Sequence, residues 1–129
     1  MKTGLKITSL LLSMLLLSFV FLGCQQTPED NEEAISFTVV VKHLDGSEKT
    51  FEYESHKAML GDALVEKGLI DGYEDTYGLT VTTVDGVYYD WNTSGVYWSL
   101  LINGEYAPSG VDSTRIVEGN TYSFVATRY

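Results

Sequence analysis

Aromatic side chains that carry a polar atom are the residues of this 129-residue chain whose chemistry most suggests binding. Such side chains suit planar or amphipathic ligands and protein interfaces, because a large apolar ring is joined to a hydrogen-bonding group. Alternation along a strand places neighbouring residues on opposite faces, so one set is expected in the core and the other at the surface. Packing is the alternative role, and it is favoured for Trp98. The six candidates are Tyr88, Tyr89, Trp91, Tyr97, Trp98 and Tyr106.

The remaining polar residues show no pattern typical of catalysis, so we do not expect an enzyme. No Gly-x-Ser-x-Gly motif occurs, and His43 and His56 stand outside any recognisable nucleophile–base arrangement. A metal pair at these two histidines is the less favoured alternative, because neither has a Cys or an acid at ligand spacing. Asp71, Glu74 and Asp75 do not form an EF-hand loop and are expected to be solvated turn acids.

The only cysteine, Cys24, ends an apolar leader. Lys2 and Lys6 precede the nearly continuous apolar run 7–22, which as a helix reaches about 24 Å, less than a hydrocarbon core of ~30 Å. A signal peptide therefore fits better than a membrane-spanning helix. The sequence Phe21-Leu22-Gly23-Cys24 resembles the lipobox of bacterial lipoproteins, in which the cysteine is lipidated and becomes the new N-terminus. An ordinary signal peptide with an incidental cysteine is the alternative.

These features divide the chain into three parts. Residues 1–23 are expected to be a lipoprotein signal peptide, 24–34 a lipidated cysteine with a flexible polar tether, and 35–129 one folded domain. Cys24 would anchor the domain to the outer, extracytoplasmic face of the cell membrane. The net charge of −10 argues against nucleic acid, which needs clustered cations, and against attraction to anionic headgroups.

The folded part starts with an expected hairpin and one helix. Alternation of apolar and polar residues over 35–41 and again over 49–55, around Asp45-Gly46, predicts two antiparallel strands. Apolar residues at helical spacing over 58–69 predict a helix that ends at Gly68, and we expect no other helix.

The second half of the domain reads as short antiparallel strands. We expect a polar loop over 71–77, a loop carrying Trp91 over 90–95, and a central strand over 96–102 that turns at Asn103-Gly104. Further strands are expected at 79–84, 87–89, 106–107 and 122–126. The compact solution is an α+β fold of β-grasp type, a mainly antiparallel sheet with one helix packed on one face.

Three segments, in this order, resemble the transcobalamin-like C-terminal domain family. They are Leu60-Gly61-Asp62-Ala63-Leu64, the strand Trp98-Ser99-Leu100-Leu101-Ile102-Asn103-Gly104, and Gly110 followed by Glu118-Gly119-Asn120-Thr121-Tyr122-Ser123-Phe124. The resemblance covers most of 35–129 and implies a β-grasp domain. In the animal cobalamin carriers the related domain helps to cover the corrinoid, but the large helical partner domain has no counterpart here. By this resemblance, the loop 89–95 and the segment after Asn103 would meet a corrinoid.

Two functional hypotheses follow. The first is a lipid-anchored binding module for a small ligand, with cobalamin or another corrinoid as the ligand that the resemblance suggests. Its contacts would come from Tyr89, Trp91, Tyr97, Trp98, Asn103 and Tyr106. The second is a cell-surface interaction domain, without a small-molecule ligand, that docks an envelope protein or a cell-wall polymer through its sheet edge or aromatic face.

Overall fold

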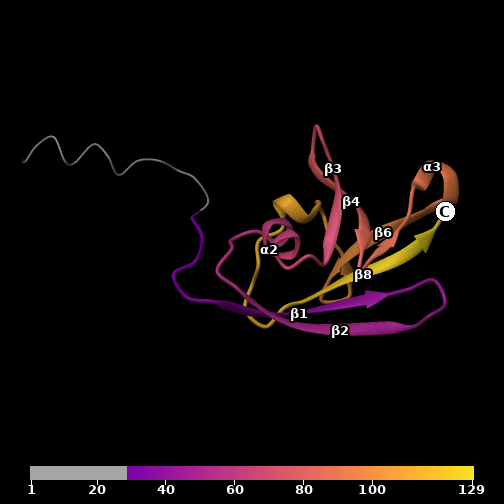
Figure 1. Ribbon diagram of the computed structural model, residues 1–129. Helices are drawn as coiled ribbons and strands as arrows, with labels where there is room; N and C mark the ends of the chain where they lie inside the picture. Colours follow the sequence, from indigo (N-terminus) through magenta and orange to yellow (C-terminus); the bar gives the residue numbers. More distant parts are fainter. Residues whose placement is uncertain (1–28) are drawn as a thin grey trace, which may run out of the picture.

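The computed structural model describes residues 29–129, so the signal peptide, Cys24 and the first part of the tether lie outside the described residues. In chain order the elements are β1 Ile35–Lys42, β2 Glu48–Ser55, α2 Leu60–Glu66, β3 Ile70–Asp75, β4 Gly78–Val84, β5 Val87–Tyr88, α3 Trp91–Ser94, β6 Val96–Ile102, β7 Glu105–Tyr106, the 3-10 helix η1 Val111–Ser113 and β8 Thr121–Arg128 (Figure 1). Within this part of the chain, no helix is long and apolar enough to span a bilayer.

The strands form two sheets. The larger has five strands in the order β2-β1-β8-β6-β7, and the smaller has three in the order β3-β4-β5. All pairs are antiparallel except β1 with β8, which run parallel at the centre of the larger sheet. Figure 1 shows α2 and the smaller sheet on the same side of the larger sheet. The expected α+β class, a mainly antiparallel sheet with a helix on one face, is confirmed.

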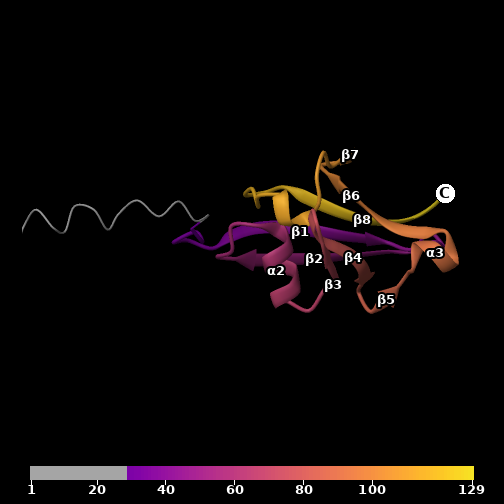
Figure 2. The same ribbon diagram turned by 90° about the horizontal axis from the view of Figure 1, so that it is seen from above.

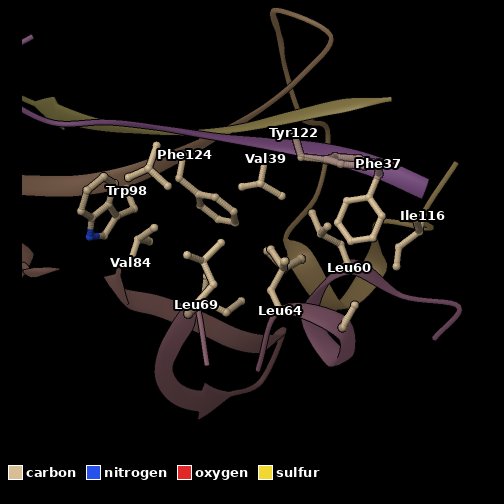
Figure 3. Close-up of a cluster of buried hydrophobic side chains, with 14 of the residues drawn as sticks. Phe37, Val39, Leu60, Leu64, Leu69, Val84, Trp98, Ile116, Tyr122 and Phe124 are labelled. Atoms are coloured by element: carbon tan, nitrogen blue, oxygen red, sulfur yellow. The ribbon is translucent and has the colours of Figure 1, made fainter. Parts of the chain in front are cut away.

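The core fills the space between these two layers (Figure 3). Alternation along β1 and β8 turns Phe37, Val39, Tyr122 and Phe124 inward, where each is at most 2% exposed. The opposing layer contributes residues of α2 and the strand ends that follow it, chiefly Leu60, Leu64, Leu69, Ile70 and Val84. Burial of these apolar surfaces is the main force holding the layers together.

The hydroxyl group of Tyr122 lies in this core, and its hydrogen bonds hold the backbone of residues 115–117, before β8, in place. The hydroxyl donates to the carbonyl of Arg115 (3.1 Å) and accepts from the backbone N–H of Val117 (2.9 Å). A buried hydroxyl without partners would be costly. The ring packs edge-on against Phe37, with centroids 5.9 Å apart.

The expected turns and the main helix end are confirmed. Gly68 follows α2 with a φ of +72°, as a helix-terminating glycine does. Asn103 and Gly104 both have positive φ, 49° and 85°, the conformation that a two-residue hairpin between β6 and β7 needs.

The expected loop over 71–77 is wrong, because Ile70–Asp75 forms β3, paired antiparallel with β4. Strand β3 forms one edge of the smaller sheet, and most of its side chains are exposed to solvent. Its sequence is therefore polar. The register shifts between Asp71 and Gly72, as at a β-bulge. The bulge interrupts the alternation of buried and exposed residues at Asp71 and Gly72. A strand could therefore not be recognised there from the sequence pattern.

The expectations of a loop over 90–95 and of a single helix are also wrong. Residues Trp91–Ser94 form the short helix α3, and η1 adds a turn of 3-10 helix. Asp90 caps α3 by accepting the N–H of Asn92 (2.9 Å), and Gly95 closes it in the left-handed conformation. Helix α3 has only four residues, which is too few to show an apolar periodicity in the sequence. It could therefore not be predicted from that pattern.

Gly72 permits a close approach of β3 to β4. A Cβ atom at this position would collide with the backbone carbonyl of Thr80, which cannot move without breaking the sheet. We expect Gly72→Ala to lower the free energy of unfolding by about 1–3 kcal/mol in denaturant titrations. Gly110→Ala is the matched control, since a Cβ there meets nothing within 4 Å and the backbone has a φ of −74°. Equal stability of the two variants would contradict this account.

The turn between β3 and β4 should show a pH signature. The hydroxyl of Thr80 and the backbone N–H of Tyr77 donate to Asp75 and hold the pKa of its carboxyl below the ordinary 3.8. Because the folded-state pKa is the lower one, the stabilisation is complete above the ordinary pKa and is lost as the pH falls through the folded value. In an NMR titration, Thr80→Val should raise the midpoint of Asp75. An unchanged midpoint would show that the hydroxyl is not the main donor.

Candidate functional site

A hollow of about 280 Å³ lies between the smaller sheet, α3 and β6, at the α3 end of the molecule. We call it the aromatic pocket, because five aromatic side chains line it: Tyr73, Tyr88, Tyr89, Trp91 and Tyr97. Four of them belong to β3, β5, α3 and β6, and Tyr89 lies between β5 and α3. Thr80, Val81, Thr82 and Asp90 also contribute to its wall. Apolar ring faces with a few polar atoms among them are the usual lining of a small-molecule site.

Helix α3 fixes the position of Trp91. The carbonyl of Asp90 accepts from the hydroxyl of Ser94 (2.7 Å), and the carbonyl of Trp91 accepts from the N–H of Gly95 (3.0 Å). The indole remains 47% exposed, so it contributes little to the core. A large aromatic side chain held at the surface by a rigid backbone is available for contact with a ligand.

Tyr129 completes an aromatic cluster beside the pocket, and the sequence analysis missed it. Its ring centroid lies 3.8 Å from that of Trp91 and 5.2 Å from that of Tyr97. Its backbone N–H donates to the carbonyl of Gly95 (3.2 Å). Pairing of β8 with β6, in which Arg128 faces Val96, carries Tyr129 to this place. The sequence does show an aromatic residue directly after β8, and this is the feature from which a contact with the start of β6 could have been predicted.

Of the six residues expected to contact a small ligand, three line the aromatic pocket, Tyr89, Trp91 and Tyr97, and the other three do not. Trp98 contacts Tyr89, with ring centroids 5.4 Å apart, but from the core side. Trp98 is only 7% exposed, and its indole N–H donates to the carbonyl of Val87 (3.2 Å), so it belongs to the core. Asn103 lies in the β6–β7 turn, where its side chain bonds Thr121 and Asn120.

Tyr106 also lies apart from the aromatic pocket. It is 74% exposed on β7 and pairs with Leu101, toward the far end of β6 from Tyr97. Strand parity separates Trp98, which points inward, from Tyr97, which lines the aromatic pocket, but it does not separate Tyr88 from Tyr89, since both line that pocket.

A second hollow, of about 680 Å³, is an acidic groove between α2, β3 and η1. Asp62, Glu66, Asp71, Glu74 and Asp112 line it, together with Lys57. Asp112 has a structural partner, because its carboxylate accepts the backbone N–H of Leu79 (2.9 Å). Within residues 29–129, no three His, Cys, Asp or Glu side chains are grouped so that they could hold a metal ion.

The two histidines do not form a pair. His43 follows β1, within 4.0 Å of Asp85 and edge-on to Trp98, whereas His56 follows β2 and contacts the carbonyl of Asn31 (3.2 Å). They therefore lie at opposite ends of the β1–β2 hairpin.

No protein-family model matches the chain. No curated protein matches it significantly. Several solved structures are similar to it. A protein from Ruminococcus gnavus, named as a candidate metal-binding protein, is 29% identical with a TM-score of 0.70, over 74% of this chain and 98% of that one. Haptocorrin in complex with Cbi is 19% identical with a TM-score of 0.57, over 76% of this chain and 26% of haptocorrin. The described domain therefore shares its fold with a segment of haptocorrin, a member of the transcobalamin family.

Proposed function

We propose that this protein is a lipid-anchored binding module that holds a small ligand in the aromatic pocket, outside the cytoplasm. The observation that carries the proposal is the convergence of Tyr89, Trp91 and Tyr97 on one hollow, with the ring of Tyr129 in contact with Trp91 and Tyr97 beside it. These rings supply contact area and hydroxyl groups, so the proposed role is binding, without a bond-making step.

The size of the aromatic pocket limits the part of a ligand that it can hold. At about 280 Å³, it falls just below the ~300–1,000 Å³ typical of sites that enclose a drug-sized molecule. It therefore suits a single ring, or one edge of a larger planar molecule whose remainder stays outside. The fold shared with haptocorrin makes a corrinoid the first ligand to test. This chain spans only 26% of haptocorrin, so a corrinoid would be held from one side.

The test is a ligand titration monitored by tryptophan fluorescence. The chain from residue 25 onward, titrated with corrinoids, haem and flavins, should show quenching at micromolar concentration by at least one of them. Trp91→Ala should weaken that binding about tenfold, because an exposed ring that contacts a ligand carries much of the binding energy.

The control for this titration is Tyr106→Ala, since Tyr106 is exposed on β7 away from the aromatic pocket and should not affect binding. Circular dichroism should show that both variants are folded. No signal from the whole ligand panel, or equal loss of binding in the two variants, would reject the aromatic pocket as the site.

The lipid anchor is tested separately. Two acyl chains on Cys24 would hold the protein stably on a membrane, whereas one chain gives only marginal binding. Expressed in a bacterium, the full chain should appear in the membrane fraction, and mass spectrometry should find an acylated cysteine at the N-terminus of the mature protein.

Cys24→Ser should move the protein to the soluble or secreted fraction. Ser18→Ala, which lies within the same leader, should leave it at the membrane. An unmodified Cys24 in membrane-bound protein would contradict the anchor while leaving the aromatic pocket untouched.

A further inference from the structure

We propose that the open edge of β2 binds an extended segment of a partner protein as an added strand, and that this segment alternates basic and apolar residues. Strand β2 ends the larger sheet, and within residues 29–129 nothing pairs with its outer side. It is eight residues long, has no proline, and follows β1 without a register shift. An edge of this kind offers a row of backbone donors and acceptors to an incoming strand.

The backbone groups that face outward can be assigned. The N–H of His43 donates to the carbonyl of Ser47 (2.9 Å), so hydrogen-bonded pairs with β1 recur at every second residue from there. Lys49, Phe51 and Tyr53 therefore direct their backbone groups toward β1. The N–H and carbonyl groups of Thr50, Glu52 and Glu54 point away from it, toward the open side.

One face of this edge is acidic. Glu52 and Glu54 lie on the outer face of the sheet, where they accept hydrogen bonds from the hydroxyls of Thr38 (3.2 Å) and Ser36 (3.4 Å). Neither carboxylate forms an ion pair with a cation of the described part of the chain. Side chains directly across from them on an added strand would lie ~5 Å away, so cationic side chains are favoured there.

The other face of the edge is aromatic. The rings of Phe51 and Tyr53 are stacked, 5.7 Å apart at 10°, and are partly buried against the core. Burial also raises the pKa of Tyr53, and the charge of Asp85 adds to this effect. The ammonium groups of Lys49 and Lys67 lie over these rings at 5.0 and 5.2 Å. Apolar side chains of an added strand would find contact here, whereas basic ones would be repelled.

Space for such a strand is present beside β2. A hollow of about 500 Å³ lies beside the part of β2 from Glu52 to Glu54, and Ser36 of β1 and Lys67 also line it. Figure 2 shows that α2 and β5 reach past β2, so the second layer overhangs this edge. Layers that pack on a sheet lie ~10 Å from it, which accommodates the inward side chains of one more strand.

A second copy of this chain is a poor occupant of the same edge. Pairing β2 with itself would bring the acidic face of one copy beside the acidic face of the other, within a chain of net charge −10. Like charges opposite each other destabilise strand pairs. The charge pattern therefore selects a basic partner.

The probe is a fluorescent, end-capped peptide of about eight residues that alternates lysine and valine, matching the length of β2. Its binding to the full chain, purified in non-ionic detergent, is followed by anisotropy. The comparison peptide has the same composition with the lysines in one block and the valines in another. We expect micromolar binding of the alternating peptide and about tenfold weaker binding of the blocked one, because only alternation matches both faces.

Matched variants locate the binding. Glu52→Gln and Glu54→Gln should each weaken binding about threefold, as expected for exposed ion pairs, and added salt should reduce the difference. Glu105→Gln removes the same charge on the opposite edge strand, β7, and should have no effect. Trp91→Ala, which tests the aromatic pocket, should also leave peptide binding unchanged, so the two proposals fail independently.

Hydrogen exchange separates strand addition from simple electrostatic attraction. Bound peptide should slow exchange of the backbone amides of Thr50, Glu52 and Glu54 about tenfold or more. N-methylation of the peptide's β2-facing amides should abolish binding, whereas methylation of the alternate amides should not. Equal binding of the two peptides, binding without amide protection, or no binding of the alternating peptide would each overturn the proposal.

Discussion

A single layer of apolar side chains, shared between the five-stranded sheet and the layer that faces it, holds this protein together. Tyr122 and Phe124 of β8 are at its centre, and Leu60 and Leu64 of α2 close it from the other side (Figure 3). Both proposed binding surfaces lie where this layer ends. The aromatic pocket forms at the α3 end, and the binding edge forms along β2. The core supports both surfaces, since Tyr89 at the aromatic pocket and Phe51 and Tyr53 at the edge pack against it.

Most of the fold could be predicted from the sequence because most elements repeat one pattern for long enough to be recognised. β1, β2 and β8 are eight residues long and alternate over most of their length, and α2 shows a clear apolar face with a glycine stop. The misses, β3 and α3, share a physical cause. β3 lies at a sheet edge with a bulge, and α3 is one turn set by its caps, so neither depends on a buried periodic face.

The candidate site could be predicted only in part. Parity along β6 separated Trp98 from Tyr97, because that argument needs only the strand itself. The contribution of Tyr73 and Tyr129 depends on which strands become neighbours, and local patterns carry no information on this. The turn at Asn103 could be predicted from the Asn-Gly motif, but the role of its side chain could not. The side chain bonds Thr121 and Asn120, and so it does not line the aromatic pocket.

The parallel pairing of β1 with β8 has a consequence for the order of events during synthesis. Thr38 lies in register with Thr121, and its N–H donates to the carbonyl of Asn120 (3.0 Å), so β1 and β8 form the middle of the sheet together. A chain that emerges from the ribosome N-terminus first cannot close its interior until β8 is available. Contacts so distant in sequence also slow folding. The nascent polypeptide therefore stays open until β8 has been synthesised, and until then the apolar faces of β1 and α2 lack part of the layer that buries them.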